Sequence, residues 1–322
     1  MRQYLFSKLP DSVRFRFLQL VTLLALGSPL ASAAATPEKL CSENAVALQV
    51  LGSGGPEISN RAGTSYLLWI GGLAKLLFDA GPGARLRFAE SGARIEDLDA
   101  VFLTHLHVDH ANDLPALIKA GYFTPRTRPL DVVGPTGNAA MPGTRRWLET
   151  LLGNDGYRYL SGHLAPHDES EFAVIGVNVN AQNSLPREVW RNGNIVVKAA
   201  AVGHGSIPAL AYRIEGPKFS FAISGDTHGE GASQKALQEL ANNATLFVAH
   251  HAIPEKATGA AKQLHMVPSQ IGRIADASNT TRLVLSHRMK RTLGEESETT
   301  SAIRKYYSGS LDFAEDLDCL PF

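Results

Sequence analysis

The chain has 322 residues, and its 31 Lys and Arg residues balance its 31 Asp and Glu residues, so the formal net charge is zero. A chain of this length, with 44% hydrophobic residues, fits one large α/β domain. Because it has no excess of positive charge, it has no overall electrostatic attraction to nucleic acid, and nucleic acid is not expected as its partner.

The first 35 residues are expected to be a signal peptide. A short apolar run over residues 17–26 is followed by the small residues Ala31-Ser32-Ala33, which are typical of a cleavage site. Four basic residues precede the apolar run: Arg2, Lys8, Arg14 and Arg16. The run is too short for a confident membrane span, although an uncleaved anchor stays open. Residues 36–322 are then expected to form a single domain with a formal charge of about −3, periplasmic or secreted and without a stable membrane span.

Apolar runs rich in β-branched residues predict strands along this domain. In chain order they cover residues 45–51, 65–70, 75–79, 98–104, 130–133, 172–179, 195–202, 209–214, 219–223, 246–249 and 283–285. Helices are expected over residues 84–91, 111–121, 145–152, 234–242, 268–277 and 302–307, and loops over 154–171 and 183–194. Two β-rich halves that each acquire helices predict an α/β fold, an αββα sandwich of two mixed β-sheets flanked by helices.

The chain has two cysteines, Cys41 just inside the expected mature start and Cys319 three residues from the end. In an oxidising compartment such a pair favours a Cys41–Cys319 disulfide that joins the two ends of the domain. Two unpaired thiols are the alternative, because the sequence does not show the distance between the two residues.

The segment His105-Leu106-His107-Val108-Asp109-His110 lies between the expected strand 98–104 and the expected helix 111–121. The end of a strand in an α/β sheet is where such folds place their chemistry. His105 and His107 are two residues apart, so in an extended segment they point to the same side and can bind one metal ion. Asp109 and His110 can face a second ion. Imidazole and carboxylate ligands suit Zn²⁺ best, with Mn²⁺ or Fe as alternatives.

Three further residues of the kinds that bind metals follow later strands. His204 follows the strand 195–202, Asp226 follows 219–223, and His287 follows 283–285. Each of the three lies next to a Gly or Ser, which allows a sharp turn of the backbone. We expect them to complete the ligand set of a site with two metal ions.

The order His-x-His-x-Asp-His followed by a later His, Asp and His resembles the metallo-β-lactamase fold superfamily, most closely the branch with tRNase Z and a group of zinc-dependent arylsulfatases. The resemblance covers nearly all of the domain. It is carried by Leu51-Gly52-Ser53-Gly54-Gly55-Pro56, Phe78-Asp79-Ala80-Gly81, His105–His110, His204 with Ala211-Tyr212-Arg213-Ile214, Ser224-Gly225-Asp226-Thr227, His250 and Ser286-His287.

The resemblance implies a site with two zinc ions. The first zinc would be bound by His105, His107 and His204; the second by Asp109, His110 and His287; and Asp226 would bridge both. A hydroxide held between the ions is the nucleophile that the resemblance implies, with Asp109 orienting it or accepting its proton.

The resemblance also implies roles for His250 and His265 in supporting the transition state or the leaving group. The alternative for both residues is support of the metal ligands without proton transfer. The chain departs from the tRNase Z pattern here, because it reads His250-His251-Ala252-Ile253 where tRNase Z has His-Glu-Ala-Thr.

Several substrate classes remain open. An exported arylsulfatase-like enzyme that cleaves sulfate or phosphate esters of small molecules is preferred. The chain lacks the long arm that binds tRNA in tRNase Z, since only residues 215–218 and one strand separate Ile214 from Ser224. A phosphodiesterase, either for cyclic nucleotides or a tRNase Z-like nuclease, is the alternative, and a non-catalytic metal-binding protein is a third. Members of this branch often dimerise, so a homodimer also stays open.

Overall fold

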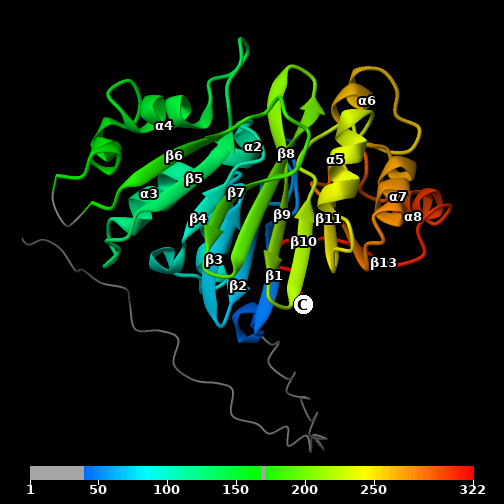
Figure 1. Cartoon of the computed structure of the whole chain (residues 1–322), viewed down its shortest axis with the longest axis horizontal. Coiled ribbons are helices and arrows are strands. Elements are labelled where there is room, and N and C mark those ends of the chain that lie inside the picture. Colours follow the sequence, from blue (N-terminus) through cyan, green and yellow to red (C-terminus); the bar gives the residue numbers. More distant parts are fainter. Residues whose placement is uncertain (1–39, 168–170) are drawn as a thin grey trace, which may run out of the picture. The chain divides into compact units, whose positions relative to one another are not determined.

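The computed structural model describes residues 40–167 and 171–322 (Figure 1). They belong to one compact unit, Lys39–Phe322. The expected signal peptide, residues 1–35, lies outside the described residues. No helix in the described part of the chain is long and apolar enough to cross a membrane.

Two mixed sheets of seven strands each form the centre of this unit. The first sheet has the order β14-β1-β2-β3-β4-β5-β6, with β1 (Val46–Gly52), β2 (Ser65–Ile70), β3 (Leu73–Phe78), β4 (Ala100–Phe102), β5 (Leu130–Pro135), β6 (Val174–Val179) and β14 (Cys319–Pro321). The second has the order β13-β12-β11-β10-β9-β8-β7, with β7 (Arg187–Asn192), β8 (Ile195–His204), β9 (Ile207–Gly216), β10 (Phe219–Ile223), β11 (Leu246–His250), β12 (Arg282–Ser286) and β13 (Ser310–Phe313).

Helices cover the outer face of each sheet. The α-helices are α1 (Ala84–Glu90), α2 (Val108–Ala111), α3 (Leu114–Gly121), α4 (Thr144–Leu152), α5 (Ala232–Leu240), α6 (Ala260–Leu264), α7 (Pro268–Ala277) and α8 (Glu296–Ile303). The 3₁₀ helices are η1 (Cys41–Glu43), η2 (Ile95–Asp97) and η3 (Arg158–Leu164). Figure 1 shows α5, α7 and α8 grouped along the second sheet, whereas α3 and α4 accompany β5 and β6 of the first.

The apolar core has three layers, as the alternation of side chains in two stacked sheets requires. Side chains such as Phe78, Phe102 and Phe221 fill the layer between the sheets. A second layer joins the first sheet to α1, α3 and α4, and a third joins the second sheet to α5, α7 and α8. The predicted αββα sandwich is therefore confirmed.

The helix that was expected to begin at Ala111 begins earlier. The chain is already helical at Val108, so Asp109 and His110 lie within the short helix α2. The helix is interrupted after Ala111, and α3 begins at Leu114. The predicted helix over 302–307 is largely wrong, because α8 covers Glu296–Ile303.

Two segments that were predicted to be loops contain regular structure. The stretch 154–171 contains η3, and the stretch 183–194 contains β7, which pairs with β8. The turn between β7 and β8 centres on Gly193, whose φ is +56°. Asn192-Gly193 is a strong sequence signal for a hairpin, and it was overlooked because the polar, half-exposed β7 lacks an apolar run.

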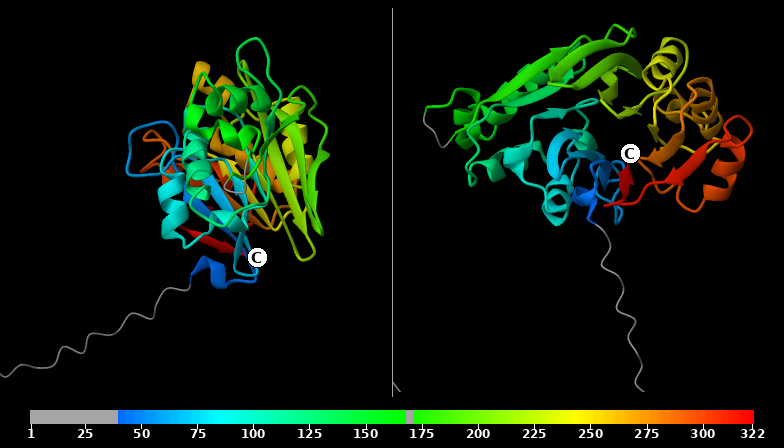
Figure 2. Two further views of the ribbon diagram at one scale, coloured as in Figure 1. Left: turned by 90° about the vertical axis from the view of Figure 1, so that its left-hand side faces the viewer. Right: turned by 60° about the horizontal axis from the view of Figure 1, so that its bottom comes forward.

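The two ends of the domain are joined as predicted. β14 pairs antiparallel with β1, with Gln49 opposite Cys319. In Figure 2 the red strand β14 lies beside the blue strand β1. Cys41 and Cys319 form a disulfide with a Cα–Cα distance of 5.4 Å, and the predicted pairing is confirmed.

Candidate metal centre

The predicted metal ligands lie at or just after the ends of strands in both sheets, in loops, in the short helix α2 and at the last residue of β8. β4 pairs in parallel with β3 and β5, and β11 pairs in parallel with β10 and β12, so the chain leaves these strands at the same edge of its sheet. All seven predicted ligands meet there: His105, His107, Asp109, His110, His204, Asp226 and His287. Six of them are at most 5% exposed, and His107 is half-buried.

The first group consists of His105, His107 and His204. His107 Nδ1 lies 3.0 Å from His105 Nε2 and 3.4 Å from His204 Nε2. His105 and His107 follow β4, whereas His204 is the last residue of β8. The structure therefore brings together the three histidines that the sequence assigned to one ion.

The second group consists of Asp109, His110 and His287. Asp109 Oδ2 lies 3.4 Å from His110 Nε2 and 3.2 Å from His287 Nε2. All three side chains are buried. These are the residues that the sequence assigned to the second ion.

Asp226 lies between the two groups. Its Oδ2 is 3.4 Å from His287 Nε2 and 3.8 Å from His110 Nε2 in the second group, and 3.9 Å from His204 Nε2 in the first. One carboxylate oxygen therefore faces both groups, as the predicted bridging role requires.

These distances test whether the residues fit metal ions. Ligands at 2.0–2.1 Å around a tetrahedral zinc ion are about 3.3 Å apart. The spacings of 3.0–3.4 Å within each group are close to that value. His110 Nε2 is also a buried nitrogen without a hydrogen-bond partner among the described residues, although it faces two carboxylates. The donor set therefore fits a pair of divalent cations.

Asp79 holds His110 in place, a role that the sequence pattern did not predict. Asp79 Oδ2 accepts a hydrogen bond from His110 Nδ1, 2.8 Å away, so that His110 Nε2 faces the metal centre. Asp79 also accepts hydrogen bonds from the backbone N–H and the hydroxyl of Thr104. Its φ of +55° places it in the left-handed region, where Asp and Asn are tolerated better than most residues. The signal was present in Phe78-Asp79-Ala80-Gly81, which we noted only as part of the resemblance.

His204 is oriented in the same way. Its Nδ1–H donates to the carbonyl oxygen of Leu264 at 3.0 Å, which leaves Nε2 free to face His107. The residue after Leu264 is His265, whose Nδ1 is 3.7 Å from Asp226 Oδ2 and has no hydrogen-bond partner among the described residues. His265 is 8% exposed.

His250 contacts Asp226 through Oδ1, the carboxylate oxygen that does not face the two ligand groups. Ligand atoms of His250, His110, Asp226 and His287 all lie within 4.8 Å of one another, so distance alone would also allow His250 to be a ligand. However, its Nδ1–H donates to Asp226 Oδ1 at 2.8 Å, and its Nε2 is 3.1 Å from the hydroxyl of Tyr66. With both ring nitrogens engaged, His250 is less suited to bind a metal than Asp109.

Burial and charge set the protonation of the site. Burial lowers the pKa of His105, His107 and His204, which keeps these imidazoles neutral, as metal ligands must be. For Asp226, burial opposes ionisation, but the nearby His287 and His110 outweigh it and hold the pKa well below its usual range. Burial also disfavours the charged form of His110, and the carboxylates of Asp79 and Asp109 overcome this and raise its pKa.

The backbone turns sharply at two of the ligands. His287 itself has a φ of +55°, and Gly225, directly before Asp226, has a φ of +58°. Gly55 leaves room for the ring of His287, because a Cβ at Gly55 would lie 2.7 Å from His287 Cε1. A non-glycine residue in the left-handed conformation costs about 1–2 kcal/mol, and such strain is typical of functional sites.

Comparison with known proteins agrees with this geometry. Residues 74–288 match the family described as "Beta-lactamase superfamily domain". Ribonuclease Z of Mycolicibacterium paratuberculosis is 29% identical over 287 residues, which cover 84% of this chain and 96% of that protein. The metallo-beta-lactamase fold protein YhfI of Bacillus subtilis aligns with a TM-score of 0.64 and 21% identity, covering 85% of this chain and 98% of YhfI. The short form of human tRNase Z aligns with a TM-score of 0.64 and 20% identity, covering 85% of this chain and 98% of that one. The protein therefore belongs to the metallo-β-lactamase superfamily.

Proposed function

We propose that this protein is a zinc-dependent phosphodiesterase with two metal ions that acts on small phosphodiesters. The observation that carries the proposal is the position of Asp226 Oδ2 within 4 Å of histidines from both ligand groups. A carboxylate in this position would hold two bound metal ions close together, and such a pair would stabilise both the attacking and the leaving oxygen of a phosphate ester.

The relatives favour phosphate over sulfate esters. The sequence favoured an arylsulfatase-like enzyme. However, the 29% identical relative from Mycolicibacterium paratuberculosis and a 28% identical relative from Mycobacterium avium are both described as ribonuclease Z. Since ribonucleases cleave phosphodiesters, the alternative of the sequence analysis becomes the preferred function.

Each residue of the site has its own role in the proposed reaction. When bound, two divalent cations would supply a water molecule of lowered pKa and polarise a phosphoryl oxygen. Asp109 would orient the attacking water and accept its proton, and its position in the second ligand group, with Oδ2 3.2 Å from His287 Nε2, supports this role. His265 would contact the leaving oxygen through its Nδ1, which has no hydrogen-bond partner among the described residues. Because burial lowers the pKa of His265 to about 3, the neutral ring would donate a hydrogen bond to this oxygen, and solvent would supply the proton. His250 acts through Asp226, which it holds by the 2.8 Å hydrogen bond.

The connection between β9 and β10 supports a small substrate. β9 ends at Gly216 and β10 begins at Phe219, so only a tight turn occupies the position where an inserted arm would bind tRNA. A groove of about 250 Å³ beside His204 is lined by the uncharged polar side chains of Thr136, Asn138 and Gln182. A surface without cationic residues suits an uncharged part of a small ester better than the phosphate backbone of a long RNA.

Export from the cytosol is part of the proposal. The Cys41–Cys319 disulfide supports it, because structural disulfides persist mainly in oxidising compartments.

The test is turnover of zinc-loaded protein on three chromogenic esters: bis-p-nitrophenyl phosphate, p-nitrophenyl phosphate and p-nitrophenyl sulfate. We expect the diester to be preferred, and we expect Asp226→Ala to lower diester turnover by more than about 100-fold. Asp276→Ala is the matched control, since Asp276 is exposed on α7. Preferred cleavage of the sulfate, or full activity of Asp226→Ala, would overturn the proposal.

A further inference from the structure

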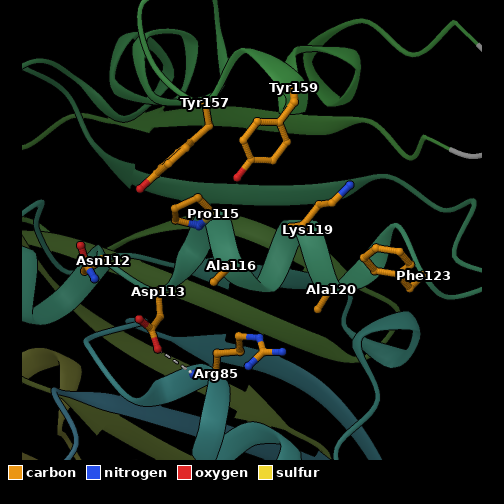
Figure 3. Close-up of a pocket in the computed structure, with 10 residues that line it drawn as sticks. All are labelled: Arg85, Asn112, Asp113, Pro115, Ala116, Lys119, Ala120, Phe123, Tyr157 and Tyr159. Carbon is orange, nitrogen blue, oxygen red and sulfur yellow. Dashed lines mark hydrogen bonds between the residues drawn. The ribbon is translucent and has the colours of Figure 1, made fainter. Parts of the chain in front are cut away.

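A second groove lies outside the metal centre, between α1, α3 and the segment that enters η3. It has a volume of about 410 Å³, which is in the range of small-molecule sites. Figure 3 shows Tyr157 and Tyr159 on one side of the groove, with their rings directed toward α3. Arg85 and Asp113 lie on the opposite side. The small residues Pro115, Ala116 and Ala120 line it from α3.

The aromatic side of the groove is exposed to solvent. Tyr159 is 66% exposed and Tyr157 is 46% exposed, although large aromatic side chains are usually packed. The two ring centres are 6.0 Å apart, with the planes inclined at 63°. Phe123, at the end of the groove, is 76% exposed. Exposed rings that converge on one groove suit a planar ligand that can stack on them.

The groove also carries positive charge that no carboxylate neutralises. Among residues 40–167 and 171–322, neither Arg85 nor Lys119 forms an ion pair. Lys119 Nζ lies 5.7 Å from the ring centre of Tyr159 and 3.9 Å from that of Tyr122. The one carboxylate in the groove, Asp113, is already engaged, because its Oδ2 accepts hydrogen bonds from the backbone N–H groups of Gly83 and Arg85.

The groove starts close to the metal centre. Asn112 and Asp113, which line it, directly follow α2, the helix that carries Asp109 and His110. From there α3 extends for eight residues, or about 12 Å, along the groove.

We propose that this groove binds a nucleotide unit, with the base stacked on Tyr159 beside Tyr157 and the phosphate near Lys119 and Arg85. The combination of exposed rings and cations without a carboxylate partner among the described residues matches a ligand that is both planar and anionic. A free nucleotide and the end of a single strand share this chemistry. A role for the groove in holding the part of the substrate beyond the cleaved ester rests on the proposed function, whereas the binding itself does not.

The test is equilibrium binding to the full domain in EDTA, so that the result does not depend on catalysis. The probes are adenosine 5′-monophosphate, adenosine, ribose 5-phosphate and a single-stranded hexanucleotide. We expect the nucleotide to bind at least about 10-fold more tightly than adenosine or ribose 5-phosphate, because each of these lacks either the charge or the ring. If the hexanucleotide binds more tightly than adenosine 5′-monophosphate, the ligand of the groove is the end of a single strand. If the two bind equally, the ligand is a free nucleotide.

Two variants locate the site. Tyr159→Ala and Lys119→Gln should each weaken nucleotide binding by about 5-fold or more. The matched control removes the same kind of pair elsewhere: Arg273 lies 4.9 Å from the ring centre of Tyr306, which is 43% exposed, so Tyr306→Ala should leave binding unchanged. The control variant Tyr306→Ala should also hydrolyse bis-p-nitrophenyl phosphate like the unmodified protein. Equal affinity for all small probes, or unchanged nucleotide binding in both groove variants, would refute nucleotide binding in this groove. This conclusion would hold even if the protein cleaves the diester.

Discussion

Replacing Asp79 by Asn tests whether the orientation of His110 controls binding at the second metal position. Asp79 is fully buried and accepts three hydrogen bonds, at 2.7 and 2.8 Å from Thr104 and at 2.8 Å from His110. Asn has the same shape and tolerates the φ of +55° at this position. However, an amide has one accepting oxygen, and its NH₂ group donates.

Neither orientation of the amide satisfies all three donors. If the oxygen faces the backbone N–H of Thr104, the NH₂ group faces His110 Nδ1. His110 can then keep a hydrogen bond only by moving its proton to Nε2, which blocks the nitrogen that faces Asp109 and Asp226. The reverse orientation places the NH₂ group against the N–H of Thr104. Each buried donor left unsatisfied costs about 1–3 kcal/mol.

We expect Asp79→Asn to fold and to bind one zinc ion normally and the second about 10- to 100-fold more weakly. The assay is zinc content after dialysis against buffered free zinc, with circular dichroism to verify folding. Asp131→Asn is the matched control, because Asp131 Oδ2 also accepts a ring N–H, from Trp190 at 2.9 Å, away from the site. Retention of two tightly bound zinc ions by Asp79→Asn would refute the argument.

Two further predictions concern stability. Burial lowers the pKa of His250 to about 4 and those of His251 and His265 to about 3, whereas in the unfolded chain each should titrate near 6.5. The unfolded state then binds more protons than the folded state below pH 6.5. The unfolding free energy of the metal-free protein should therefore fall by up to about 2 kcal/mol per histidine from pH 7 to pH 5. Equal urea midpoints at the two pH values would contradict this prediction. The Cys41–Cys319 disulfide joins residues with a sequence separation of 278. Its reduction should lower the unfolding free energy by about 5 kcal/mol, because the unfolded chain gains the entropy of an open loop. An unchanged urea midpoint in the presence of reductant would contradict this prediction.

The sequence by itself determined the fold and the seven candidate ligands. Apolar runs of strand length appear wherever a strand is buried on both faces, as in β10 and β11, and these strands were predicted closely. The ligand candidates were also accessible, because His, Asp and neighbouring Gly or Ser after a strand are a local pattern. His204, Asp226 and His287 each follow this pattern, and the structure brings all three to the histidines after β4.

Local sequence patterns did not predict the elements whose position depends on contacts between distant segments. The half-exposed strand β7 is stabilised by its pairing with β8 and not by an apolar run of its own. α8 begins six residues before the predicted helix, and its packing against α7 through Ile303 decides its place.

The tertiary structure alone decided the roles of the residues around the ligands. Asp79 and His110 are 31 residues apart and Tyr66 and His250 are 184 apart, so no local pattern links either pair. Only their hydrogen bonds show which nitrogen of His110 faces the metal centre and that both nitrogens of His250 are engaged. The groove between α3 and η3 has the same origin, because Lys119 and Tyr159 lie on different elements and form one surface only after the chain has folded. Side-chain types can be read one at a time along a chain, but the direction of a hydrogen bond and the shape of a groove depend on the relative positions of segments that folding brings together.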